Sequence, residues 1–154
     1  MLKDFKDVLC TFNDHHVEYL VVGGFAVSYH AQPRATKDLD VFVNADASNA
    51  KKVFAALAAF GAPVAGYNSR DFEDPNKFFR FGREPVAIDI LPSISGVVFR
   101  EAWARRLEVV IDEESGLRAF FISKTDLIAS KLAAGRTRDL ADVEEINKAD
   151  DRGE

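Results

Sequence analysis

Two glycines and two aspartates at the ends of neighbouring apolar runs constrain the fold of this chain more than any other feature. Gly23 and Gly24 follow the run YLVV, and Asp38 and Asp40 stand at the head of the run DLDVFV. Paired glycines let a backbone turn sharply and approach a phosphate closely. Carboxylates at positions i and i+2 of a strand project from the same face, with Cα atoms roughly 7 Å apart. The segment therefore predicts a divalent metal held against a triphosphate, and with it phosphoryl or nucleotidyl transfer.

A third carboxylate lies inside a later apolar run. Asp89 interrupts VAIDIL, and an Asp in a central strand is costly to bury unless something pairs with it. Together with Asp38 and Asp40 it predicts a hard-oxygen site for Mg²⁺ or Mn²⁺. Each carboxylate also has an ordinary explanation: Asp38 as a helix-loop cap, Asp40 as an edge residue, and Asp89 as the ion-pair partner of an arginine. The neighbouring glycines favour the joint metal site.

Hydrophobic periodicity predicts a mixed β-sheet covered by helices, an α/β (α+β) fold with a short helical C-terminal segment. The predicted helices cover residues 3–15, 25–31, 46–60, 99–106, 123–135 and 137–149. The predicted strands cover residues 18–22, 39–43, 77–81, 86–91, 107–112 and 117–122. At 154 residues we expect one domain, with a core at 1–122, a helical extension at 123–149 and a frayed tail at 150–154.

Composition narrows the possible binding partners and the cellular compartment of the protein. A net charge of −5 and a pI of about 5.3 argue against a broad, nonspecific grip on nucleic acid. Cys10 is the single cysteine, which favours a reducing compartment, and we expect it to be buried on the first helix. The N-terminal MLKDFKDVLC has no signal-peptide core, and no run reaches the length of a membrane span. We expect a cytoplasmic protein.

The order of these motifs resembles the nucleotidyltransferase (polymerase β-like) superfamily. Its hallmark is hG[G/S], then [DE]h[DE], then a third acidic residue on a later strand; here these are Gly23-Gly24, PRATKDLD and IDI at 88–90. The form is most similar to small bacterial minimal nucleotidyltransferases and to those of abortive-infection and toxin–antitoxin systems. The resemblance covers residues 17–92 and extends into 126–146. Its helical lysine and R-x-x-D elements match Lys131, Arg136, Asp139 and Asp142.

The resemblance implies a Mg²⁺-dependent transfer of a nucleoside monophosphate from an NTP to an acceptor hydroxyl, with release of pyrophosphate. It implies that Asp38 and Asp40 bind the metals and the triphosphate. Asp89 would bind the catalytic metal or act as base on the acceptor hydroxyl. The acceptor would be a protein hydroxyl, a tRNA 3′ end or a small molecule. A second copy of the chain or a separate helical toxin or antitoxin partner would help to hold it.

The resemblance also implies a set of nucleotide-binding residues. The set comprises Gly23, Gly24, Arg34, Thr36, Lys131 and Asp139. The glycines would cradle the phosphates, and Lys131 would contact the triphosphate as a point charge. Alternatives stay open for two members. Asp139 pairs with Lys131 at a helix–helix junction or caps the last helix, and Arg34 reaches a phosphate or anchors its loop to Asp38.

Two other functions compete with catalysis. The first is a non-catalytic nucleotide-binding or antitoxin module. The second is an interaction domain whose carboxylates only pair with nearby arginines. The complete carboxylate set argues against the first of these. Several basic residues predict a solvated face, with a basic rim for RNA or polyphosphate as the alternative; they are Lys77, Arg80, Arg83, Arg100, Arg105 and Arg106. A further group of aromatic residues is expected in the core: Phe78, Phe79, Phe81 and Trp103.

Overall fold

The centre of the protein is a mixed β-sheet. The computed structural model describes residues 1–83 and 85–151, and within them the sheet has six strands in the order β3-β4-β2-β1-β6-β5. The strands are β1 (Tyr19–Val22), β2 (Asp38–Val43), β3 (Phe79–Phe81), β4 (Ala87–Leu91), β5 (Leu107–Asp112) and β6 (Leu117–Phe121). The inner pairs β2–β4 and β1–β6 are parallel, whereas β1–β2 and the two edge pairs are antiparallel. The predicted fold class is confirmed.

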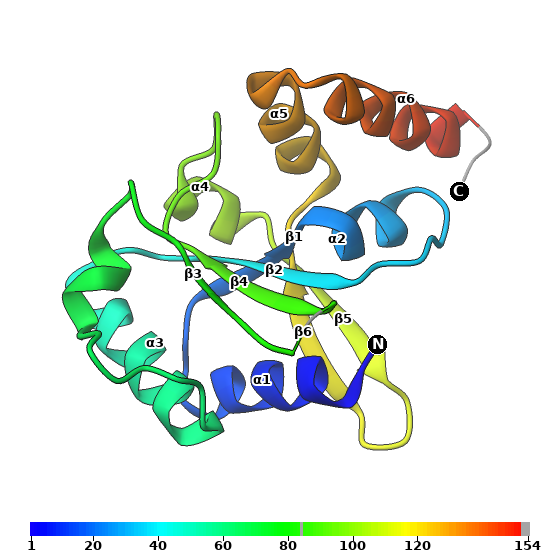
Figure 1. Cartoon of the computed structure of the whole chain (residues 1–154). Helices are drawn as coiled ribbons and strands as arrows, with labels where there is room; N and C mark the ends of the chain where they lie inside the picture. The colour runs from blue at the N-terminus through cyan, green and yellow to red at the C-terminus, as the bar shows by residue number, and fades with distance from the viewer. Residues whose placement is uncertain (84, 152–154) are drawn as a thin grey trace.

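Helices cover both faces of this sheet (Figure 1). They are α1 (Lys3–Asp14), α2 (Gly23–His30), α3 (Ala47–Phe60), α4 (Phe99–Ala104), α5 (Lys124–Ala134) and α6 (Thr137–Asp151). Helices α1 and α3 contact each other below the sheet, and α2 contacts α5 and α6 above it. Among the described residues, none of the helices has both the length and the apolar character needed to cross a membrane.

Local chemistry sets the helix ends close to where the sequence places them. The Asp46 side chain caps α3 by accepting a hydrogen bond from the Asn49 backbone N–H at 2.7 Å, and Ser123 caps α5 in the same way. Both helices stop at a glycine in the left-handed region, Gly61 and Gly135, which a residue with a Cβ adopts only at a cost.

Several boundaries differ from prediction, among them the start of β3 at Phe79 rather than at residue 77 and the end of α4 at Ala104 rather than at residue 106. Helix α2 begins at Gly23 rather than Phe25, and the expected loop 62–76 contains a short 3₁₀ helix, η1 (Ser69–Glu73), capped by Asn68. Helix α6 extends to Asp151, and residues 152–154 of the expected tail lie outside the described residues.

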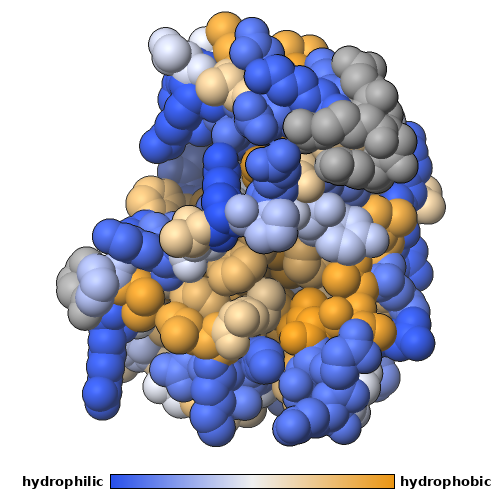
Figure 2. All heavy atoms as spheres, turned by 90° about the vertical axis from the view of Figure 1, so that its right-hand side faces the viewer, coloured by the Kyte–Doolittle hydropathy of each residue, from blue (hydrophilic) through white to orange (hydrophobic). Residues whose placement is uncertain are grey.

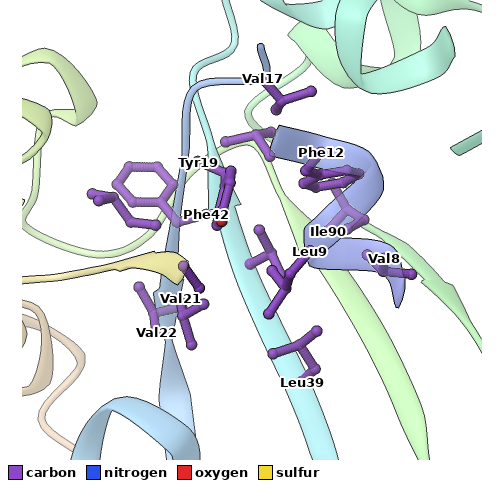
Figure 3. Close-up of a cluster of buried hydrophobic side chains, with 14 of the residues drawn as sticks. Val8, Leu9, Phe12, Val17, Tyr19, Val21, Val22, Leu39, Phe42 and Ile90 are labelled. Carbon is purple, nitrogen blue, oxygen red and sulfur yellow. The ribbon is translucent and has the colours of Figure 1, made fainter. Parts of the chain in front are cut away.

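The two faces of the sheet have different chemistry. Val8, Leu9 and Phe12 of α1 are fully buried and point at Leu39 and Ile90 of the sheet (Figure 3). These inward positions leave Cys10 exposed as a free thiol, so its predicted burial is wrong. The opposite face is apolar further along its strands and polar where β2 begins.

The side of the molecule at the right of Figure 1 exposes apolar atoms. They form a band between hydrophilic surfaces above and below it (Figure 2). The N-terminus and the β5–β6 hairpin lie on this side (Figure 1).

Candidate active site

Three carboxylates meet on the upper face of the sheet. Asp38 and Asp40 occupy alternate positions of β2, and Asp40 is paired in register with Asp89 on the adjacent parallel strand β4. Residues paired across neighbouring strands project from the same face, so register and alternation bring the three together. We call Asp38, Asp40 and Asp89 the carboxylate cluster.

The carboxylate cluster carries uncompensated negative charge. Burial, followed by the charge of Asp89, raises the pKa of Asp40 to about 7. Asp89 is 8% exposed, and its Oδ1 atom is buried without a hydrogen-bond partner. Buried carboxylate oxygens are normally paired, so an orphaned one marks a place where a cation or a donor is missing.

An arginine partly occupies that place. Arg80 lies on the edge strand β3 directly opposite Asp89, with its Nη1 2.8 Å from Asp89 Oδ2 and its Nη2 3.4 Å from Asp38 Oδ2. Asp38 Oδ1 accepts a hydrogen bond from the Ala87 backbone N–H at 3.1 Å, so Asp38 is not a helix-loop cap. The ion pair of Asp89 with an arginine is present, and Arg80, whose side chain is 45% exposed, lies at the solvated surface as predicted.

The donor chemistry of the carboxylate cluster fits a hard divalent cation. Within residues 1–83 and 85–151, no three His, Cys, Asp or Glu side chains are arranged to hold a metal ion as they stand. The Arg80 guanidinium instead bridges Asp38 and Asp89. Carboxylate oxygens are nevertheless the ligands that Mg²⁺ or Mn²⁺ prefers, and the orphaned Asp89 Oδ1 and the raised pKa of Asp40 show that the site lacks positive charge.

The two glycines make room for this cluster. Gly23 has φ +65°, and a Cβ there would overlap the Asp40 carboxylate. At Gly24 a Cβ would lie 2.8 Å from the Thr36 methyl carbon, so Thr36 closes the turn by packing against the glycine. Glycine is therefore required at 23 by both conformation and space. The backbone at the start of α2 lies directly against the carboxylates.

A cleft of about 250 Å³ extends from the carboxylate cluster to the C-terminal helices. Its lining includes Gly23 and Asp40 from the sheet side and Lys131 and Arg136 from the C-terminal helices. We call it the β1–α5 cleft. Its other polar lining groups include Ser95, Ser130 and Asp139. A carboxylate of the cluster and two cations in one cleft suit a metal-bound triphosphate.

A second group of charges lies where α5 meets α6. We call its members the helix-junction cluster: Arg34, Lys131, Arg136, Asp139 and Asp142. Lys131 Nζ is 2.9 Å from Asp142 Oδ2 and 3.5 Å from Asp139 Oδ1. Asp139 also accepts from the Arg136 backbone N–H at 3.2 Å, so both expected roles of Asp139, pairing with Lys131 and capping α6, are present. Arg34 is not anchored to Asp38, because its Nη1 binds Asp142 Oδ1 at 2.8 Å, and its contact with a phosphate stays a prediction.

The helix-junction cluster is electrostatically satisfied. The Arg136 hydrogen bond is the largest of the effects that lower the pKa of Asp139. Burial acts to raise the pKa of Asp142, but hydrogen bonds from Arg34 and Lys131 outweigh it and the pKa is lowered.

Several side chains expected on a solvated face are held in specific contacts. Arg105 forms a two-pronged pair with Asp126, at 2.8 and 3.0 Å, and Arg100 binds Glu18 at 3.1 Å. The Arg106 guanidinium lies 4.0 Å from the centre of the Trp103 ring. These residues are exposed, as the solvated-face prediction requires, and Arg100 and Arg105 also bind acidic partners from distant parts of the chain.

Phe78 is the aromatic residue misplaced by sequence reasoning. Its neighbour Phe79 is buried as expected, whereas Phe78 is 63% exposed. Successive strand residues point to opposite sides, so both cannot enter the core.

Neither Arg80 nor Arg136 was among the predicted site residues, although Arg136 matches the R-x-x-D element of the resemblance. A signal existed for each. Arg136 stands three residues before Asp139, the spacing of helix neighbours. Arg80 is the one charge within the apolar strand FFRF. Its pairing with Asp89 depends on strand register, which cannot be read from the sequence.

Comparisons with known proteins agree with this geometry. A family model described as a nucleotidyltransferase of unknown function (DUF6036) matches residues 2–150. A crystal structure of the lincosamide antibiotic adenylyltransferase LnuA, lincomycin-bound, has a similar fold. Its TM-score is 0.55 at 16% identity, over 97% of this chain and 98% of that chain. An antigenic nucleotidyltransferase-like protein from Paracoccidioides brasiliensis has a TM-score of 0.53 at 15% identity, over 95% of this chain and 75% of that chain. No curated protein matches the sequence.

Proposed function

The chain belongs to the DUF6036 family of nucleotidyltransferases of unknown function, and on that premise we propose that it transfers a nucleoside monophosphate from an NTP to an acceptor hydroxyl. The acceptor oxygen forms a bond to the α-phosphorus, and the bond from that phosphorus to the pyrophosphate oxygen breaks. The observation that carries the proposal is the β1–α5 cleft, which is lined by Asp40 of the carboxylate cluster and by the cations Lys131 and Arg136.

The carboxylate cluster is proposed to hold Mg²⁺ or Mn²⁺. Asp38 and Asp40 supply oxygens from β2, and Asp89 supplies the orphaned Oδ1 from β4. A bound divalent ion there neutralises charge on the triphosphate and on the leaving pyrophosphate. Asp89 either completes the ligand set or accepts the proton of the acceptor hydroxyl.

The helical side of the β1–α5 cleft is proposed to hold the rest of the triphosphate. Lys131 and Arg136 place positive charge on the β- and γ-phosphates, and Gly23 at the start of α2 lines the same cleft. Arg34 and Asp139 act through the helix-junction cluster by fixing the position of Lys131 and Arg136. Thr36 keeps the turn closed against Gly24.

A non-catalytic nucleotide-binding or antitoxin module is the second candidate function. The observation that favours it is Arg80, which occupies the space between Asp38 and Asp89. In this reading the guanidinium is a permanent counter-ion, and the β1–α5 cleft binds nucleotide without transfer. A helical protein partner or a second copy of the chain would then contact the apolar band of Figure 2.

Labelled nucleotide distinguishes the two candidates and identifies the acceptor class. The protein is incubated with each α-³²P-NTP, with Mg²⁺ or EDTA, and with separate protein, tRNA and small-molecule fractions of a lysate. The proposal expects metal-dependent label in one fraction. Nucleotide binding by calorimetry without label in any fraction supports the binding module. Neither binding nor label with any NTP contradicts both.

A further inference from the structure

We propose that Arg80 is a built-in competitor of the divalent cation, occupying the position between Asp38 and Asp89 until a metal displaces it. This rests on the proposed function only in taking the carboxylate cluster as the metal site. It assigns a role to a residue outside the motifs that mark the superfamily.

The geometry sets Arg80 in this position from the backbone upward. Edge strand β3 runs antiparallel to β4, and Arg80 is paired in register with Asp89. The guanidinium fork spans two strands, because one nitrogen binds Asp89 on β4 at 2.8 Å and the other binds Asp38 on β2 at 3.4 Å. A planar fork with several donors bridges separate carboxylates in a way that a single ammonium cannot.

One guanidinium does not neutralise the carboxylate cluster. Arg80 brings one positive charge to three carboxylates, contacts Asp38 and Asp89, and leaves Asp89 Oδ1 without a partner. Among the described residues, the hydrogen bonds of the Arg80 guanidinium go to Asp89 and Asp38, whereas Asp40 lies in register beside Asp89. A divalent cation between these oxygens offers more charge at shorter range than the guanidinium does. The metal therefore displaces the Arg80 guanidinium when it is present at sufficient concentration.

Arg80 can leave without disturbing the fold. Its side chain is 45% exposed and its strand is at the edge of the sheet. Rotation about side-chain bonds carries the guanidinium into solvent while the β3–β4 ladder stays intact. Lys131 in the helix-junction cluster is the contrast, since its side chain is 12% exposed and bound by two carboxylates. Of these two cations, Arg80 is therefore the one that can leave its carboxylates.

Metal titration by isothermal calorimetry tests the competition directly. Mg²⁺ and Mn²⁺ are titrated separately into wild type, Arg80→Met and Arg118→Met, without nucleotide and at constant ionic strength. Arg118 forms an exposed 3.6 Å pair with Glu108 on the β5–β6 hairpin, so its loss matches the charge change away from the site. Removing the guanidinium is expected to lower the metal Kd about tenfold, because repulsion between like charges is relieved. Arg118→Met should bind as wild type does.

Two further variants test where the metal binds and whether the loss of Arg80 affects folding. Adding Asp40→Asn to Arg80→Met should abolish the gain, which locates the metal in the carboxylate cluster. If circular dichroism shows that Arg80→Met is not folded, Arg80→Gln is titrated with the same expectation, since it keeps a polar group at the position.

The outcomes separate this inference from the proposed function. Equal or weaker metal binding by the Arg80 variants, with measurable binding by wild type, overturns the competition and leaves the metal site standing. Failure of wild type and variants alike to bind metal, even with an NTP present, overturns the metal-dependent function together with the competition.

Discussion

Two clusters of carboxylates lie a short distance apart in this molecule, and their charge balance is opposite. In the helix-junction cluster, two carboxylates are shared among three cations, and the pKa values of Asp139 and Asp142 are lowered. In the carboxylate cluster, three carboxylates share Arg80, one oxygen is orphaned, and the pKa of Asp40 is raised to about 7.

The difference teaches which cluster is structural and which is poised for a ligand. A satisfied ionic network holds its elements together, whereas an under-compensated one is a cost that a fold tolerates where a cation binds. The helix-junction cluster ties the loop before β2 to α5 and α6. Asp40 of the carboxylate cluster lines the β1–α5 cleft.

The largest expected effect comes from removing a ligand of the carboxylate cluster. Asp38→Asn or Asp40→Asn should reduce nucleotidyl transfer on the order of a thousandfold, because several kcal/mol of charge stabilisation by the metal is lost. Transfer of labelled NMP is the measurement, with circular dichroism to check folding. Asp14→Asn, at an exposed position at the end of α1, is the matched control and should keep full activity. Near-normal turnover in either site variant means that the metal assignment is wrong.

The opposite behaviour is expected of the helix-junction cluster. Asp139→Asn leaves Lys131 and Arg136 short of a counter-charge and should lower the free energy of unfolding by about 3 kcal/mol. Urea denaturation measures it. Asp89→Asn is the comparison variant, and it should be neutral or stabilising without metal because it relieves repulsion with Asp40. Equal destabilisation by both variants would remove the distinction between the clusters.

The pH dependence of stability sharpens the comparison. Burial and Asp89 raise the pKa of Asp40 from 3.8 to about 7, so its ionisation opposes folding. Stability should fall as the pH rises from about 4 to about 7 and then level off. Asp40→Asn removes this cost, and without metal it should be more stable than wild type by about 2 kcal/mol at pH 8, with little difference at pH 4. Thermal denaturation in EDTA at the two pH values decides it, and a pH-independent difference contradicts the raised pKa.

The smallest expected effect concerns the link between the loop before β2 and α6. Arg34→Met removes one half-exposed ion pair with Asp142, while Lys131 still compensates that carboxylate. The loss of unfolding free energy should be about 1 kcal/mol or less. Thermal denaturation beside Arg118→Met, whose pair is exposed on both sides, provides the reference. A loss as large as that of Asp139→Asn would show that Arg34 is as essential to the cluster as the buried carboxylate.

Much of the fold was readable in the sequence because its signals are local. The N-caps Asp46 and Ser123 and the stops Gly61 and Gly135 act within one turn of their helices. The strands are apolar runs, and Asp38, Asp40 and Asp89 stand out because charges are rare in such runs. The predicted burial of Cys10 was wrong because Val8, Leu9 and Phe12 take the inward positions of the same helix.

The sequence by itself determined the mixed sheet with its helices and singled out the glycine pair and the three carboxylates as candidate site residues. The tertiary structure alone decided which charges meet. Strand register put Arg80 against Asp89, and the packing of α5 and α6 over α2 paired Arg34 with Asp142 rather than with Asp38. The physical reason is range. Caps, turns and alternation follow from neighbours in the chain, whereas an ion pair depends on where two distant backbones place their side chains.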